Sequence, residues 1–168
     1  MTHVRPNKSG RAPLAPIWCA GRPAAVVGYF AAVDRALEFM ERYRAAFVRG
    51  DVVEVLGFYE YPLQLVDVGN RPVSMSAVDV DGWRRTVGRI VRAYRQLAVS
   101  DASTGAFDVI ETLPGAALVR ARWTLRGPGG NPIYDFSAAY SLTDLGQGLR
   151  IVAITHDEVP KLRAALAG

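Results

Sequence analysis

The sequence predicts an α+β domain in which three N-terminal helices pack on a curved antiparallel sheet and enclose an internal pocket. Two long helical patterns, over about 32–49 and 79–97, flank a shorter helix and a segment of alternating residues. From Phe107 onward, apolar residues recur at every second position, which indicates long strands. Each long strand has one apolar and one polar face, as expected when helices cover only one side of a sheet.

The chain has 168 residues, half of them apolar, and is long enough for one globular domain with a substantial core. Its net charge of +4 comes from the N-terminal part, because the rest of the chain has equal numbers of acidic and basic residues. A basic tail can touch nucleic acid or anionic lipid, but a solvated extension is the favoured interpretation and we expect no nucleic-acid partner. The basic residues of this tail are Arg5, Lys8, Arg11 and Arg22.

A single cysteine, Cys19, excludes an intramolecular disulfide and favours a reducing, cytoplasmic location. Arg22 interrupts the apolar run from Leu14 to Val33, so we expect neither a secretory signal nor a membrane span. We divide the chain into a flexible basic leader or over-extended start (1–30), a folded domain (31–160) and a C-terminal tail or short helix (161–168).

The first helix is predicted from a stripe of apolar side chains at helical spacing, formed by Ala36, Met40, Tyr43 and Phe47. Tyr43 therefore lies on the buried face of this helix rather than in solvent. Gly50 is a natural residue just past the C-terminus of such a helix.

A second helix, over about 52–59, begins with an Asp-x-x-Glu capping pattern formed by Asp51 and Glu54. It has to end before Pro62, because proline disfavours helical backbone in the residue that precedes it.

The segment 63–68 alternates as a strand and places Asp67 in one row with Leu63 and Leu65. Gly69-Asn70 forms a turn, after which residues 71–75 can pair back as a hairpin.

A third helix begins at Asp79 or Asp81 and has a wide apolar face with arginines on the opposite side. The arginines could bind phosphates, but a solvated face is favoured because no Gly-rich loop or aromatic platform accompanies them. The apolar face consists of Trp83, Val87, Ile90, Val91, Tyr94 and Leu97, and the arginines are Arg84, Arg85, Arg89, Arg92 and Arg95.

The remainder of the chain is predicted to form a meander of strands separated by turns rich in glycine and proline. A terminal helix over 160–167, with Pro160 in its first turn, completes the chain. The expected strands are 107–111, 117–125, 134–142 and 149–156, with turns at Pro114-Gly115, 127–132 and 143–148.

This order of elements resembles the nuclear-transport-factor-2-like superfamily over about 33–159. The cone-shaped fold of that superfamily is shared by ketosteroid isomerases, polyketide cyclases of the SnoaL type and scytalone dehydratase. The resemblance implies a cone with an internal pocket and a homodimer that forms through the sheet.

Within the superfamily, the stretch RYRAAFVRGD resembles the first helix of the ketosteroid isomerases, where an Arg-Tyr pair precedes a Gly-Asp joint. The resemblance implies that Tyr43 corresponds to the oxyanion-hole tyrosine and Asp67 to the general base. The second acid of the isomerase oxyanion hole falls on Ala138, and the nearby Asp135 points to the opposite face of its strand. His156 falls where the isomerases have an aromatic residue in the pocket.

These residues are our candidate catalytic groups, and each has an alternative role. A buried carboxylate at Asp67 would have its proton affinity raised, although an exposed aspartate before a turn is equally common. Tyr43 could donate to a ligand oxygen or be a packed core tyrosine. His156 could assist proton transfer or lie exposed at the end of a strand.

We expect the pocket to bind a small, largely apolar molecule. The aromatic residues that line it could contact the ligand or simply form its hydrophobic wall.

The sequence has no nucleophile elbow, phosphate loop, dinucleotide fingerprint or metal-ligand pattern, so we expect no cofactor and no metal. The first hypothesis is a SnoaL-like pocket protein with cofactor-free isomerase, cyclase or dehydratase chemistry. The alternative is a non-catalytic binding or dimerisation module. The predicted ligand-binding residues are Tyr59, Trp83, Trp123, Phe136 and Tyr140.

Overall fold

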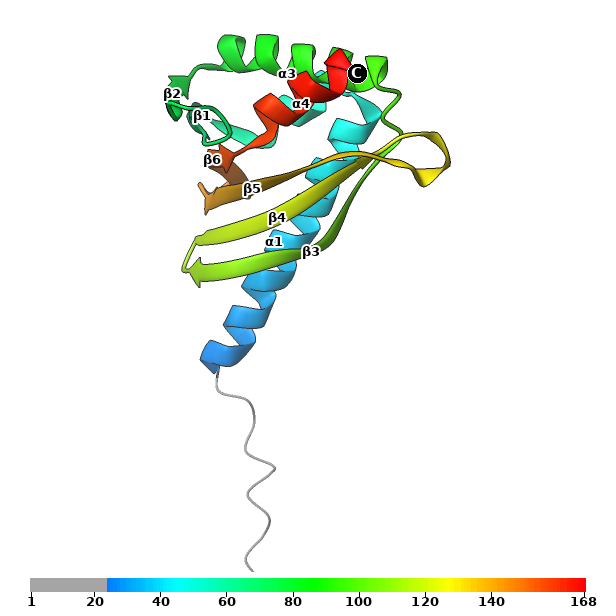
Figure 1. Cartoon of the computed structure of the whole chain (residues 1–168). Coiled ribbons are helices and arrows are strands. Elements are labelled where there is room, and N and C mark those ends of the chain that lie inside the picture. Colours follow the sequence, from blue (N-terminus) through cyan, green and yellow to red (C-terminus); the bar gives the residue numbers. More distant parts are fainter. Residues whose placement is uncertain (1–23) are drawn as a thin grey trace, which may run out of the picture.

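A computed structural model describes residues 24–168 and shows a curved sheet with helices packed against it (Figure 1). The expectations about the leader up to residue 23, including Cys19, lie outside the described residues. The helices are α1 (Ala24–Arg49), α2 (Val52–Leu56), α3 (Val80–Gln96) and α4 (Glu158–Ala167), with a short 3-10 turn at Pro128–Gly130. The strands are β1 (Tyr59–Asp67), β2 (Ser74–Val78), β3 (Asp101–Leu113), β4 (Ala116–Arg126), β5 (Pro132–Asp144) and β6 (Leu149–His156).

The strands form one six-stranded sheet in the order β2-β1-β6-β5-β4-β3. The meander from β3 to β6 pairs antiparallel throughout, as does the β1–β2 hairpin. The pairing of β1 with β6 is parallel, a detail that the expected antiparallel sheet did not include. This pairing joins the hairpin to the meander and places the C-terminal ends of β1 and β6 side by side, with Asp67 opposite His156.

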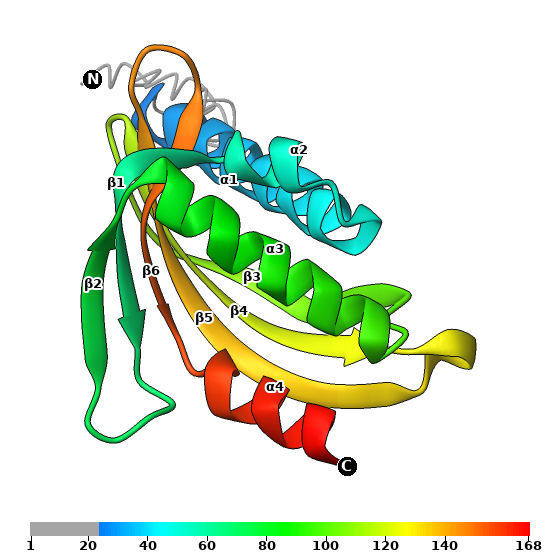
Figure 2. The same cartoon turned by 90° about the horizontal axis from the view of Figure 1, so that it is seen from above.

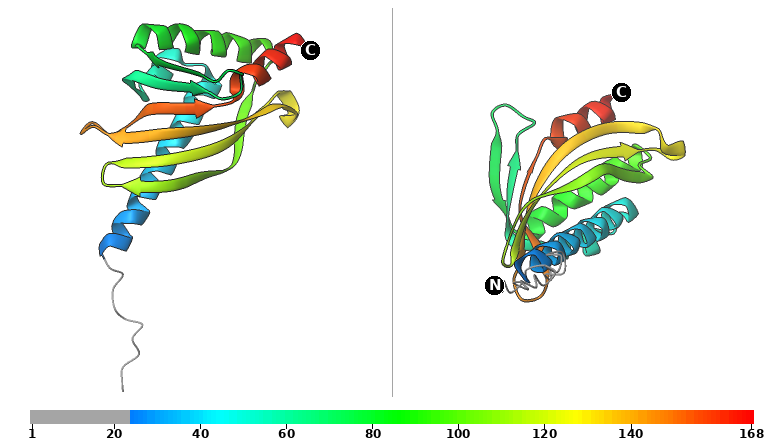
Figure 3. Two further views of the ribbon diagram at one scale, coloured as in Figure 1. Left: turned by 60° about the vertical axis from the view of Figure 1, so that its left-hand side comes forward. Right: turned by 90° about the horizontal axis from the view of Figure 1, so that it is seen from below.

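Helices α1 and α3 lie together on one side of the curved sheet, as seen from above and below (Figures 2 and 3). Helix α4 follows β6 and packs against β5 and α3. The apolar faces predicted for the first and third helices point into the core, where Met40, Val87 and Leu63 are buried. The structure therefore confirms the α+β class and the one-sided covering by helices. None of the described helices is both long and apolar enough to cross a membrane.

The predicted helix caps are present. Asp51 accepts a hydrogen bond from the Glu54 backbone N–H at 3.0 Å, and Asp79 accepts one from Gly82 at 2.7 Å. Gly50 ends α1 with a φ of +67°, a conformation that favours glycine. These local signals fix the two joints that orient α2 and α3.

Several element boundaries differ from the predictions for identifiable reasons. Helix α1 begins at Ala24 rather than Ala32, because no proline or capping signal interrupts the intervening residues. Strand β1 begins at Tyr59 rather than Leu63, and a shift in its register with β6 between Tyr59 and Gln64 accommodates Pro62 inside the strand.

The second strand of the hairpin and the first strand of the meander also differ from the predicted ranges. Strand β2 spans Ser74–Val78 rather than 71–75, because pairing of Asp67 with Ser74 leaves Pro72 in the connection. Strand β3 begins at Asp101, six residues before the range in which the alternation was recognised. Glycine at position 105 and polar residues around it hide the apolar alternation in this part of the strand.

Candidate functional site

A cavity of about 60 Å³ lies between α1, α3, the inner face of the sheet and the start of α4. Helix α1 contributes Tyr43 and Phe47, and α3 contributes Trp83 and Tyr94. The strands contribute further aromatic and aliphatic side chains, so most of the lining is apolar. Such a mainly apolar space with a few polar groups is typical of small-molecule sites.

Most of the predicted site residues line this cavity. They are Tyr43, Trp83, Trp123, Phe136, Tyr140 and His156. Asp67 and Tyr59 are buried as well, but they do not belong to the lining. Ala138, which stands where the isomerases carry a second acid, does line the cavity and contributes only a methyl group.

The tyrosine hydroxyls around Tyr43 form hydrogen-bonded pairs. The hydroxyls of Tyr43 and Tyr59 lie 2.8 Å apart, and the indole Nε1–H of Trp123 donates to the Tyr140 hydroxyl at 2.9 Å. Burial raises the pKa of Tyr43 well above its ordinary value, so its hydroxyl keeps its proton. Tyr43 is thus both a packed core residue, with its ring against Phe47, and a hydroxyl on the cavity wall.

Asp67 holds the turn that follows β1. Its Oδ1 accepts the Gly69 backbone N–H at 2.9 Å, and its Oδ2 accepts the Asn70 Nδ2–H at 2.6 Å. Asp67 is 6% exposed, so it is not the solvent-exposed turn residue, and it is not among the residues that line the cavity. Because both oxygens are engaged, Asp67 fixes the position of the turn.

His156 ends β6 and lies on the cavity wall rather than in solvent. Its Nδ1 accepts the backbone N–H of Glu158 at 3.3 Å, which places the proton of the neutral ring on Nε2. Burial lowers the pKa of His156, and the charges of Asp67 and Asp157 oppose this effect. A neutral imidazole with a donor at Nε2 is therefore the favoured form near neutral pH.

Glu158, the first residue of α4, is a buried carboxyl group that the sequence analysis missed. Its Oε1 accepts hydrogen bonds from the Tyr94 hydroxyl at 2.6 Å and the Tyr134 hydroxyl at 2.8 Å. Burial raises its pKa, although the two hydroxyls act in the opposite direction. Its spacing from Ile154 and His156, two cavity residues at alternate positions, was a signal that could have identified it.

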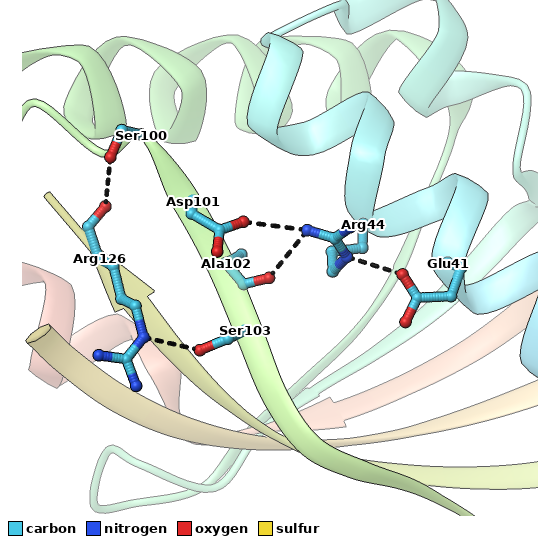
Figure 4. Close-up of polar contacts among 7 residues, drawn as sticks. All are labelled: Glu41, Arg44, Ser100, Asp101, Ala102, Ser103 and Arg126. Atoms are coloured by element: carbon cyan, nitrogen blue, oxygen red, sulfur yellow. Dashed lines mark hydrogen bonds and ion pairs between the residues drawn. The ribbon is translucent and has the colours of Figure 1, made fainter. Parts of the chain in front are cut away.

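Arg44 is a second charged residue on the cavity wall that was missed, and it connects α1 to β3 (Figure 4). Its Nη1 donates to Asp101 Oδ1 at 3.0 Å and to the Ala102 carbonyl at 3.2 Å. Its Nε donates to Glu41 Oε2 at 2.8 Å. Two carboxylates thus already balance the charge of Arg44, and its role is to fasten the helix to the sheet.

The indole N–H of Trp83, a residue of the cavity wall, has no regular hydrogen bond among the described residues. Trp83 Nε1 is buried and makes no hydrogen bond of normal geometry within the described part of the chain. The indole packs edge-on against Tyr59 with ring centroids 5.3 Å apart and lowers the pKa of the Tyr59 hydroxyl, against the larger raising effect of burial. An unpaired buried N–H is costly, and because the nitrogen itself is buried it is not exposed to the cavity.

Apart from the tyrosine hydroxyls and the ion-paired Arg44, the polar side chains of the cavity wall are His156 and Glu158. His156 offers the donor Nε2–H, and Glu158 offers a carboxyl group. Across residues 24–168, the described His, Cys, Asp and Glu side chains form no group of three that could hold a metal ion. The arrangement has the components for hydrogen bonding and proton transfer to a small organic molecule.

The family described as "NTF2-like protein (DUF6841)" matches residues 34–159, and the chain belongs to this family. This result confirms the superfamily inferred from the order of helices and strands. A search of curated proteins found no match.

Solved structures agree on the fold. An NTF2-like protein with a cystatin-like fold from Novosphingobium aromaticivorans superposes with a TM-score of 0.59 at 16% identity, covering 85% of this chain and 94% of that chain. A proposed dehydratase of the NTF2-like family from Streptomyces avermitilis has a TM-score of 0.58 at 15% identity, with coverage of 76% and 96%. A protein of unknown function from Mycobacterium tuberculosis has a TM-score of 0.59 at 15% identity, with coverage of 84% and 92%. At these identities the likeness establishes the fold alone.

Proposed function

We propose that this protein binds a small, largely apolar molecule in the cavity between α1, α3 and the sheet. The observation that supports the proposal most directly is the aromatic lining of the cavity, which includes Tyr43, Trp123 and Phe136. Such a lining gives affinity by removing apolar surface from water, while a few polar groups orient the ligand.

The chemistry that suits this site is proton transfer without a cofactor, of the isomerase, cyclase or dehydratase type. Tyr43 would donate a hydrogen bond to a ligand oxygen, and His156 would assist the proton transfer. Both side chains lie on the wall of the same cavity, and Tyr43 retains its proton because it is buried. The likeness in fold to a proposed dehydratase is consistent with this class of reaction.

Ligand binding can be tested with a matched pair of substitutions on β5. Ala138 lines the cavity, whereas Ala139 is partly exposed and points to the other face of the strand. In a titration of tryptophan fluorescence with cyclohexanone, Ala138→Leu should weaken binding by about tenfold, and Ala139→Leu should leave it unchanged. Equal affinity in both variants would contradict binding in this cavity. Circular dichroism would verify that both variants are folded.

Turnover can be tested with a panel of small enones and polyketide fragments across a range of pH. Wild type and Asp67→Asn should be compared, because Asp67 is the base that the resemblance to isomerases implies. Activity that survives in Asp67→Asn would assign the proton transfer to another group of the site. No turnover of any member of the panel by the wild type would leave the protein as a non-catalytic binding module.

We further propose that the chain forms a homodimer through the outer face of the sheet. This face carries charges of both signs in pairs, with Arg120 2.8 Å from Asp108 and Arg122 3.7 Å from Asp135. A surface with interspersed charges of both signs can be complementary to a second copy of itself. Light scattering after size-exclusion chromatography should give the mass of a dimer, and Arg122→Glu should reduce it to that of a monomer.

A further inference from the structure

Glu158 is a buried carboxyl group without a cationic partner. It is 9% exposed, and no described Lys, Arg or His side chain forms an ion pair with it. Buried carboxylates are rare unless they are paired, because moving a charge out of water is costly. Its retention at the wall of the cavity therefore calls for an explanation beyond packing.

The two oxygens of this carboxyl group have different surroundings. Oε1 accepts both tyrosine hydroxyls, from Tyr94 on α3 and Tyr134 on β5. Oε2 makes no hydrogen bond with any residue that the structure describes, although the side chain lines the cavity. The tyrosines thus fix the orientation of the carboxyl group and leave Oε2 free to act on a ligand.

The charged and titratable groups around Glu158 favour a proton affinity nearer to neutral pH than usual. Burial raises the pKa of Glu158 most strongly, and the charge of the adjacent Asp157 raises it further. The hydroxyls of Tyr94 and Tyr134 lower it in part, and the neighbouring His156 is neutral. A carboxyl group whose pKa lies closer to the working pH is a more effective general base than an exposed one.

We propose that Glu158 Oε2 is the general base of this site, and that the substrate is a small enolisable carbonyl compound about the size of a single ring. The inference rests on the proposed function and assigns the proton transfer to Glu158 in place of Asp67. The donor for the carbonyl oxygen is His156 Nε2–H, since His156 lies on the wall of the same cavity and its Nδ1 accepts the Glu158 backbone N–H.

The volume of the cavity limits the substrate. The volume of about 60 Å³ corresponds to roughly four to six ordered water molecules. This volume suits one small ring or a short chain, and a fused skeleton of several rings requires more room. The part of the substrate that the cavity holds is therefore about the size of one small ring.

The proposed step balances without a further reactant. Oε2 of ionised Glu158 removes a proton from the carbon between the carbonyl and the C=C bond of a β,γ-unsaturated ketone. The C–H electron pair forms a new C=C bond, and negative charge collects on the carbonyl oxygen, where His156 Nε2–H stabilises it. Protonated Glu158 then returns the proton to the γ-carbon, the C=O bond re-forms and the product is the conjugated ketone.

The test uses the full chain and a β,γ-unsaturated cyclohexenone, with the absorbance of the conjugated isomer as the readout. Glu158→Gln keeps an acceptor for the tyrosines and should lower kcat by about 100-fold or more. The matched control is Glu60→Gln, the same chemical change at an exposed position of β1, which should retain the wild-type rate. Loss of activity in Asp67→Asn with full activity in Glu158→Gln would overturn the proposal.

A second measurement separates a direct role from a structural one. The rate should rise with pH as Glu158 ionises, and Tyr134→Phe should move this rise to higher pH because it removes a hydrogen bond that lowers the pKa. An unchanged pH profile in folded Tyr134→Phe would overturn the proposal. If wild type binds the ketone without isomerising it, the base assignment fails while the pocket function stands. If the ketone does not bind, the proposed function itself is contradicted.

Discussion

The hydroxyl of Tyr94 lies 2.6 Å from Glu158 Oε1, and this contact joins α3 to the first residue of α4. Hydrogen bonds to carboxylates are stronger than those between neutral groups, particularly away from water. The contact therefore has two effects. It fixes the start of α4 at one end of the cavity, and it partly offsets the cost of burying the carboxyl group.

The raised pKa of Glu158 predicts how stability depends on pH. Burial makes the folded protein bind this proton more tightly than the unfolded chain, whose Glu pKa is about 4.5. Stability contributed by protonation is present below this value and is lost as pH rises through the folded-state pKa. As pH rises from about 4.5 through the folded-state pKa, the free energy of unfolding should therefore fall less in Glu158→Gln than in the wild type. Urea unfolding at a series of pH values measures this difference. Exposed Glu60→Gln should follow the wild-type curve, and an identical curve for Glu158→Gln would contradict the prediction.

Removal of one tyrosine hydroxyl should change the titration of Glu158 directly. In Tyr94→Phe the pKa of Glu158 should rise further, because a hydrogen bond that lowers it is lost. The free energy of unfolding should fall by about 1–3 kcal/mol at a pH where Glu158 is ionised. Carbon NMR of labelled glutamate carboxyl groups would follow the titration. Tyr61→Phe is the control, since the Tyr61 hydroxyl donates to the Leu56 carbonyl and does not touch Glu158.

The fold could be predicted largely from local patterns. The stripe containing Tyr43, the cap at Asp51 and the alternation in the strands after Phe107 each depend on neighbours in the sequence, so their periods are visible there. The parallel pairing of β1 with β6 is not visible in the same way, because it joins residues that lie far apart in the chain. Pro62 likewise suggested an end to regular structure, whereas a shift in register absorbs it.

The site was predictable only in part. Tyr43 and His156 could be placed on the cavity because a stripe or a resemblance pointed to them. Glu158 reads from the sequence as an ordinary acidic residue at a helix N-terminus, where it complements the helix dipole. Its burial depends on Tyr94 and Tyr134, which approach from distant parts of the chain. The role of Glu158 in the site thus depends on tertiary contacts, which a local sequence pattern does not reveal.

His156 provides a second pH-dependent test. The negative charge of Asp67 raises the pKa of His156 against the larger lowering effect of burial, so Asp67→Asn should lower it further. Because the folded-state pKa of His156 lies below the unfolded value of about 6.5, the protein loses stability as pH falls from about 6.5 through the folded-state pKa. Proton NMR of the imidazole should show the lower midpoint, with His156→Gln identifying the resonance. Asp135→Asn, at an exposed position of β5, should leave the midpoint in place, and no shift in Asp67→Asn would contradict the assignment.

Two tryptophans of the cavity wall should respond differently to the same substitution. Trp123 Nε1 donates to the Tyr140 hydroxyl, whereas Trp83 Nε1 has no hydrogen-bond partner of normal geometry within the described chain. Both changes to phenylalanine remove a similar volume, but Trp123→Phe also removes a buried hydrogen bond. It should therefore cost about 1 kcal/mol more than Trp83→Phe in the free energy of unfolding. Chemical denaturation of both variants under one set of conditions provides the comparison, and a larger loss for Trp83→Phe would oppose it.

The turn held by Asp67 should be sensitive to any side chain at Gly69. A Cβ atom at this position would lie 2.8 Å from the Asp157 carbonyl oxygen and from two ring carbons of Pro160. Gly69→Ala should therefore push the turn away from the start of α4, at a cost of about 1–3 kcal/mol in stability. Because Asp157 precedes Glu158, the glutamate carboxyl resonance should also shift. Gly105→Ala is the control, since a Cβ there meets nothing within 4 Å. Equal stability of the two variants in urea unfolding would show that this turn does not constrain α4.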